Sequence, residues 1–111
     1  MSVKTEAKSG LTVCCIEGEI DINTAPDIKK AFEKLLAKKD PRIVINLTKV
    51  TYVDSSGLAT LVEILKNMRA YGGRMRLTNM SHKIKSLFEI TKLEKLLEII
   101  ADEAEAITTF V

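Results

Sequence analysis

The chain has 111 residues, of which 46% are apolar and 29% are charged, and this composition is typical of one soluble globular domain rather than of a disordered chain. Its formal net charge of +2 gives no general attraction to nucleic acid or to membrane surfaces. Because no apolar run is long enough to span a bilayer and residues 1–10 lack the apolar core of a signal peptide, we expect a cytoplasmic protein.

The N-terminal part of the chain predicts strands followed by a helix. Residues 2–8 are expected to add an edge strand to the sheet. Residues 11–20, LTVCCIEGEI, are rich in β-branched and apolar residues and predict a strand. Residues 23–40 predict a helix, because Thr24 can cap it, Pro26 fits its first turn, and apolar residues recur at helical spacing.

The rest of the chain continues the alternation of strand and helix patterns. Residues 42–47, RIVINL, are nearly continuous in apolar residues, as expected of a central strand covered on both faces. The later predicted elements are, in order, a helix from Leu58 that ends at Gly72-Gly73, a strand over 74–79, a helix over 82–90 capped by Ser81, a short strand over 96–100 and an acidic helix over 102–110. This order predicts an α/β fold with a mixed, mostly parallel β-sheet and helices packed against it, formed by residues 1–111 as a single domain.

The two cysteines are neighbours, Cys14 and Cys15, on the first long predicted strand. Adjacent side chains on a strand point to opposite faces, so at most one thiol is expected in the core. With His82 as the only histidine, the sequence supplies no ligand set for a metal, and we expect two reduced cysteines and no metal site.

The most informative motif is Asp54-Ser55-Ser56-Gly57, which follows the buried strand Ile43–Leu47 and precedes a helix. In open α/β sheets this is where ligands and partners usually meet the protein. Either Asp54 or Ser55 can accept hydrogen bonds from the free amides of the first helical turn. A glycine in that turn would let another molecule approach the backbone closely. A plain helix cap is the simplest interpretation of such a motif.

A catalytic interpretation of the same motif has little support. A serine nucleophile needs a base held by a third group, and His82 lies outside any recognisable motif. The lysine and glycine spacing of a phosphate-binding P-loop is missing as well. We therefore expect no enzymatic activity and no cofactor.

Three segments together resemble a known family. GEIDINTAPDIKKAF, IVINLTKVTYVDSSGLATLV and GGRMRLTNMSHKIKSLFEITKLEKLLEI look like parts of the STAS domain, in the order that family shows. Within the family they are most similar to bacterial anti-sigma factor antagonists, also called anti-anti-sigma factors. The resemblance extends from about Leu11 to the C-terminus, and its most specific parts are residues 18–21 and 54–58.

The resemblance implies a phosphorylation switch. Such proteins bind an anti-sigma factor that is also an ATP-dependent serine kinase, and binding releases the sigma factor for transcription. The kinase phosphorylates the serine directly after the Asp of the motif, which here is Ser55, and a PP2C-type phosphatase restores the active form. ATP and Mg²⁺ would belong to the kinase. The resemblance makes this chain a substrate and binding module. The small net charge predicts no nucleic-acid or membrane partner, and a monomer is the favoured oligomeric state.

The predicted site has one phosphorylation position, Ser55, and a partner surface around it. This predicted surface contains seven residues: Asp21, Asn23, Asp54, Ser55, Ser56, Gly57 and Leu58. Asp21 is expected to be an exposed polar residue of that surface, at the end of a neighbouring strand. The alternative function is a STAS accessory or scaffold subunit of a transport system or of a stress-signalling assembly. Outside the site, Arg74 and Arg76 are expected to form a solvated face of their strand.

Overall fold

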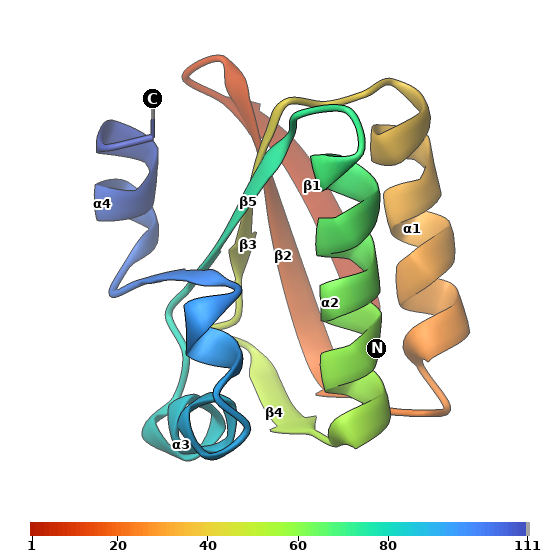
Figure 1. Ribbon diagram of the computed structural model, residues 1–111, viewed down its shortest axis with the longest axis vertical. Helices are drawn as coiled ribbons and strands as arrows, with labels where there is room; N and C mark the ends of the chain where they lie inside the picture. Colours follow the sequence, from red (N-terminus) through yellow and green to blue (C-terminus); the bar gives the residue numbers. More distant parts are fainter. Residues whose placement is uncertain (111) are drawn as a thin grey trace.

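The computed structural model describes residues 1–110 and shows strands and helices alternating along the chain (Figure 1). The elements, in chain order, are β1 (Ser2–Lys8), β2 (Leu11–Ile20), α1 (Ala25–Ala37), β3 (Arg42–Asn46), β4 (Val50–Val53), α2 (Ser55–Arg69), β5 (Arg74–Thr78), α3 (His82–Ile90), the 3₁₀-helix η1 (Leu93–Lys95), β6 (Glu98–Ile100) and α4 (Glu103–Thr108).

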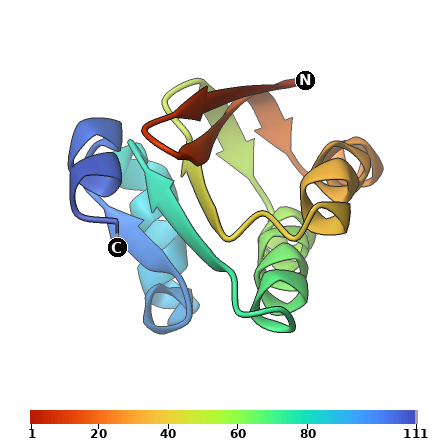
Figure 2. The same cartoon turned by 90° about the horizontal axis from the view of Figure 1, so that it is seen from above.

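The sheet has six strands in the order β1-β2-β3-β5-β6, with β4 paired to β2 off this path (Figure 2). The β1–β2 pair is antiparallel, and the other pairs are parallel, with Val13 opposite Val44 and Ile43 opposite Met75. The predicted α/β fold with a mixed, mostly parallel sheet is confirmed, and so is the edge strand over residues 2–8.

Strand β4 is an element that the sequence analysis missed. The first part of β2 pairs with β3 and its last residues pair with β4, and the register shifts between Gly18 and Glu19. Gly18 has a φ of +107°, a conformation that a residue with a side chain rarely adopts, and it lies where β2 changes partner. The motif at Asp54 therefore follows β4 rather than the central strand directly.

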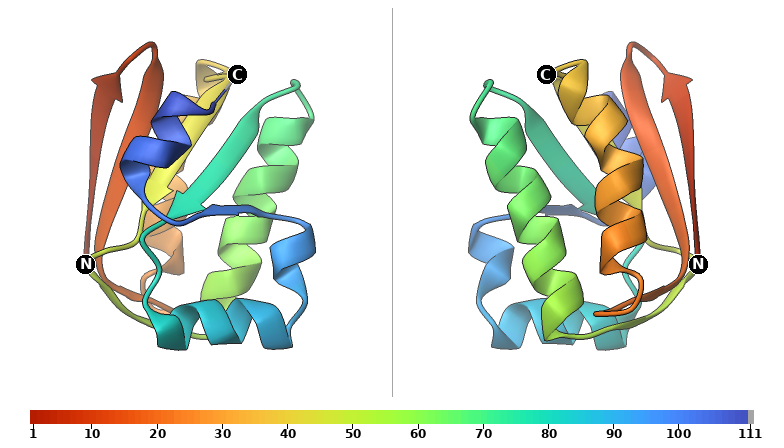
Figure 3. Two further views of the ribbon diagram at one scale, coloured as in Figure 1. Left: turned by 90° about the vertical axis from the view of Figure 1, so that its left-hand side faces the viewer. Right: turned by 90° about the vertical axis from the view of Figure 1, so that its right-hand side faces the viewer.

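Two apolar layers enclose the sheet. The larger core lies between the sheet and helices α1, α2 and α3, where Phe32, Leu61 and Phe88 are fully buried. The smaller one lies under α4 on the other face, where Phe110 packs with Val13 and Val44. Figure 3 shows α1 and α4 on opposite sides of the sheet. Strand β3 is thus covered on both faces, as its continuous apolar sequence predicted.

The two arginines of β5 do not form the solvated face that the sequence predicted. Arg76 is only 8% exposed, and its guanidinium lies 4.6 Å from the centre of the Phe110 ring, with Arg74 at 5.0 Å. Both arginines also contact the Glu98 carboxylate, at 2.6 Å from Arg74 and 3.3 Å from Arg76. The prediction was wrong because α4 folds back over this strand. Arg76 also donates to the Ala106 carbonyl, at 3.0 Å, which fixes that helix in place.

Both cysteines are free, with Cys14 buried and Cys15 half-buried, as the alternation of strand side chains predicted. Burial, together with the nearby charge of Asp40, raises the pKa of Cys14 to about 12. Within residues 1–110 no group of three or more His, Cys, Asp and Glu side chains is arranged to hold a metal ion. In the same part of the chain, no helix has the length and apolar character needed to cross a membrane.

Candidate functional site

The candidate site is built on the beginning of α2. Asp54 is the residue before the helix, and its Oδ1 accepts a hydrogen bond from the Gly57 amide at 2.8 Å. The backbone carbonyl of Asp54 accepts the next one, from Leu58, at 3.0 Å. Asp54 and Ser55 were both predicted as possible caps of this helix, and Asp54 is the residue that caps it. Ser55 is the first residue of the helix and is exposed, so its hydroxyl is accessible to another molecule.

Gly57 serves a close contact inside the protein, not the approach of a ligand as the sequence analysis expected. It is buried, and a Cβ atom at this position would lie 2.1 Å from the Ile20 carbonyl oxygen and 2.8 Å from its carbon. The same carbonyl accepts a hydrogen bond from the Asp54 amide, at 3.2 Å. The absence of a side chain at Gly57 therefore lets the beginning of α2 press against the end of β2.

Asp21 is buried, at 7% exposure, so the expectation of an exposed polar residue is wrong. Its Oδ1 accepts hydrogen bonds from the amides of Asn23, at 2.9 Å, and Thr24, at 3.0 Å. The Thr24 amide, and to a lesser extent that of Asn23, lowers the pKa of Asp21 against the opposing effect of burial. Asp21 is the carboxylate that holds the turn between β2 and α1, which the sequence alone did not reveal.

Thr24 completes this turn in a way that differs from a simple helix cap. It occupies the position before α1, but its hydroxyl donates to the Glu19 carbonyl, at 2.8 Å, and accepts from the Asp21 amide, at 2.9 Å. The turn is thereby fixed on both sides. It presents Ile22 and Asn23 to solvent, and Ile22 is 68% exposed. An apolar residue between two polar turn residues was the signal in the sequence, and it was overlooked.

The structure brings the two predicted halves of the site together. Because Ile20 contacts both the Asp54 amide and Gly57, the turn that follows it lies beside the beginning of α2. Ile22 and Ser56 line one shallow hollow, which we call the α1–α2 groove, together with Ala25, Pro26, Lys29, Ala59, Thr60 and Glu63. The seventh predicted residue, Leu58, is buried in the main core, and it reaches a second hollow along α2 that Ser55 also lines.

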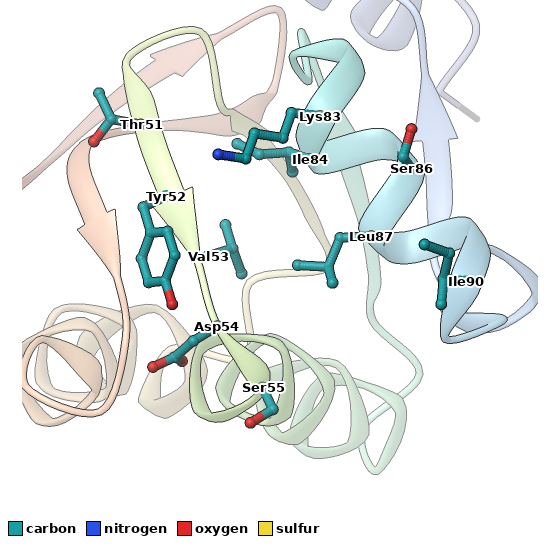
Figure 4. A pocket seen from close by; sticks show the side chains of 10 residues that line it. All are labelled: Thr51, Tyr52, Val53, Asp54, Ser55, Lys83, Ile84, Ser86, Leu87 and Ile90. Carbon is teal, nitrogen blue, oxygen red and sulfur yellow. The ribbon is translucent and has the colours of Figure 1, made fainter.

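Another pocket opens beside Ser55, between β4 and α3 (Figure 4). This β4–α3 pocket has a volume of about 450 Å³ and is lined by Thr51, Tyr52, Val53, Asp54, Ser55, Lys83, Ile84, Ser86, Leu87 and Ile90. Its lining is mainly apolar, and Lys83 is the cation among these residues. The sequence does not reveal a role for α3 here, because this pocket arises only when β4 and α3 come together.

The surroundings of Ser55 suit a negatively charged group. His82, the only histidine of the sequence, is not among the residues that line the hollows beside Ser55. The amides of the first turn and the positive end of the helix dipole do favour an anionic group at this position. The site is an exposed serine on a rigid frame, surrounded by apolar hollows.

This fold and this site define a small α/β domain with an exposed serine at the first residue of a helix. The STAS domain profile matches residues 2–106, and the chain belongs to the STAS domain family.

Several known proteins are similar in sequence to this chain over most of its length. An anti-sigma-B factor antagonist of Listeria monocytogenes is 39% identical over 90 residues, which make up 81% of this chain and 79% of the relative. The anti-sigma-B factor antagonist of Bacillus subtilis is also 39% identical, over 88 residues and 78% of each chain. The crystal structure of an anti-sigma factor antagonist from Mycobacterium paratuberculosis superposes with a TM-score of 0.87 at 25% identity, and the match covers 96% of this chain and 91% of that one.

Proposed function

We propose that this protein is an anti-sigma factor antagonist. In its unphosphorylated form it binds an anti-sigma factor with serine kinase activity, and the sigma factor is released. The kinase, which supplies ATP and Mg²⁺, transfers phosphate to Ser55 and ends the interaction, and a PP2C-type phosphatase reverses the modification. The observation that carries the proposal is the exposed Ser55 at the start of α2, in a chain whose relatives are named anti-sigma-B factor antagonists.

The fold can accept a phosphate at Ser55. The modification adds about −1.5 to −2 charges and three strong acceptors at neutral pH. At the first residue of a 15-residue helix, those charges meet free amides and the positive end of the helix dipole. Asp54 already uses one amide, that of Gly57, so other amides of the first turn are left to the phosphate. The domain therefore stays folded when it is modified.

The partner surface does not accept the same phosphate. Ser55 lines both the β4–α3 pocket and the hollow along α2, so a group added to its hydroxyl projects into the surface that a partner would cover. The neighbouring Asp54 carboxylate adds a further negative charge. Burying these charges together against a partner is unfavourable, while leaving them in water costs little. The fold thus tolerates the phosphate, whereas the interface does not. This combination makes a reversible switch.

The choice of serine is tested by phosphorylation with the cognate kinase. The protein is incubated with ATP and candidate anti-sigma kinases encoded in the same genome, and the phosphate is located by mass spectrometry. We expect the parent and the Ser56→Ala variant both to be phosphorylated at Ser55, because Ser56 is half-buried within the first turn. Ser55→Ala is expected to remain unmodified. Phosphate that persists in Ser55→Ala and disappears in Ser56→Ala would overturn the assignment.

A further inference from the structure

The modified serine lies on a rigid element, and this constrains how a kinase reaches it. Ser55 is the first residue of α2, and the residues on either side of it are held by hydrogen bonds, from Gly57 to Asp54 and from Asp54 to Ile20. An enzyme that drew this segment out as an extended strand would have to break the helix cap. A kinase that modifies the folded protein must therefore dock on the surface around Ser55, and its affinity depends on what that surface offers.

Exposed apolar side chains are concentrated around that serine. Among residues 1–110, the exposed large hydrophobic side chains are Met1, Ile22, Tyr52, Ile90 and Leu96. Three of these, Ile22, Tyr52 and Ile90, line hollows that also contain Ser55 or Ser56. Exposed hydrophobic side chains gathered around one point of a surface commonly mark a protein contact.

Two of these three side chains, those of Ile22 and Ile90, lie on opposite sides of Ser55. Ile22, 68% exposed, precedes α1, and Ile90, 79% exposed, is the last residue of α3. Helices α1 and α3 flank the beginning of α2 on either side (Figures 1 and 4). Each isoleucine borders its own hollow, Ile22 the α1–α2 groove and Ile90 the β4–α3 pocket.

Both isoleucines are also held in place by their surroundings. The turn of Ile22 is fixed by the buried Asp21 carboxylate, which accepts from the Asn23 amide. The end of α3 at Ile90 is fixed by Thr91, whose hydroxyl donates to the Leu87 and Phe88 carbonyls at 3.0 and 3.1 Å. An anchor whose backbone is already ordered loses little conformational freedom on binding, so more of its apolar burial is retained as affinity.

We propose that Ile22 and Ile90 are the two apolar anchors by which the anti-sigma kinase docks on the folded domain, one on each side of Ser55. The partner surface implied is one with two apolar contact regions that flank its phosphate-transfer centre. This inference rests on the proposed function and adds to it the residues that determine partner affinity. Neither isoleucine was among the residues that the sequence assigned to partner binding.

The test measures the affinity of the unphosphorylated protein for its cognate anti-sigma kinase by isothermal titration calorimetry. The variants are Ile22→Ser, Ile90→Ser and their double mutant, with Leu96→Ser as the matched control. Leu96 is an exposed apolar residue, at 44%, that lines neither the β4–α3 pocket, nor the α1–α2 groove, nor the hollow along α2. Thermal melts of all variants are expected to match the parent closely, because the substituted side chains are exposed.

We expect each isoleucine variant to bind on the order of tenfold more weakly than the parent, and the Leu96→Ser control to bind within about twofold of it. Because the two anchors lie in separate hollows, the factors should multiply in the double mutant. If both isoleucine variants bind as tightly as the parent while Ser55→Asp does not bind, the anchors are refuted and the proposed function stands. If the parent binds no anti-sigma kinase, the proposed function is refuted and the anchors with it. Equal weakening by Leu96→Ser would show a nonspecific effect and would also overturn the anchors.

Discussion

Replacing Gly57 with alanine tests the contact that joins the two halves of the site. Alanine within a helix is normally more stable than glycine by about 1 kcal/mol. Here the added Cβ would lie 2.1 Å from the Ile20 carbonyl oxygen, where atoms in contact are more than 3 Å apart. The obstacle is backbone rather than the end of a flexible side chain, so α2 or the end of β2 must move.

The expected size of the effect follows from these two opposing terms. Overpacking of a tight interior contact costs about 1–3 kcal/mol and sometimes more, and a clash with backbone belongs at the upper end. After the helical gain of about 1 kcal/mol, Gly57→Ala should lose about 2 kcal/mol of unfolding free energy. For a domain of this size that corresponds to a melting temperature lower by roughly 8 °C.

The assay is thermal unfolding followed by circular dichroism, supported by urea titration. Asn67→Ala is the matched control, because Asn67 is an exposed residue of the same helix and its replacement should be neutral or slightly stabilising. A Gly57→Ala variant as stable as the parent, or more stable, would refute the close contact between α2 and β2. We also expect this variant to bind the kinase more weakly, because movement at Ile20 displaces the turn of Ile22 relative to Ser55.

Two further predictions concern the turn before α1 and the C-terminal cover of the sheet. Asp21→Ala should lower the melting temperature by several degrees, because two turn amides lose their acceptor. Folding lowers the pKa of Asp21 from 3.8, so the ionised carboxylate stabilises the parent above that pH, and this contribution is lost on further acidification. The stability deficit of Asp21→Ala should therefore shrink in melts below about pH 4. An equal deficit at all pH values would contradict this. Phe110→Ala should cost about 3 kcal/mol in urea denaturation, because the ring fills the core under α4 and contacts both β5 arginines; a loss below about 1 kcal/mol would show that α4 contributes little.

Local sequence patterns predicted most of the elements because each carries its own periodicity. The continuous apolar run at β3 predicted a strand covered on both faces, and Ser81 was correctly predicted as a cap, with the Ile84 amide donating to its hydroxyl at 3.2 Å. Strand β4 was missed because its four residues pair only with the far end of β2. Its residues, Val, Thr, Tyr and Val, do favour a strand, but the segment is short and lies directly between the apolar run of β3 and the motif at Asp54.

The errors at two polar side chains have different physical origins. Asp21 and Arg76 are polar residues that sequence reasoning places at the surface. Asp21 is buried because it accepts amides from its own turn, and Arg76 is buried because α4, about thirty residues later in the chain, folds over it. Burial of Arg76 by a segment distant in sequence leaves no local pattern to detect, whereas the turn of Asp21 is local and its carboxylate was assigned to the surface instead of to the turn amides.

The candidate site divides in the same way. Capping chemistry predicted the role of Asp54 before α2, which is confirmed, and the family resemblance singled out Ser55, whose phosphorylation stays a prediction. The hollows around Ser55 could not be found, because each one forms between elements that are separated in the sequence, such as β4 and α3. For that reason Ile22 and Ile90 emerge only from the folded structure.

The central claim is that charge on Ser55 controls binding without unfolding the domain. The most direct measurement compares the affinity of the cognate anti-sigma kinase for the parent and for Ser55→Asp, with thermal stability measured on the same samples. The carboxylate is acceptable at a helix N-terminus, so we expect stability within about 1 kcal/mol of the parent. Binding should weaken by at least about tenfold, because the charge enters the contact surface beside Asp54. Binding as tight as that of the parent, at unchanged stability, would contradict the account and show that charge at Ser55 is not the switch.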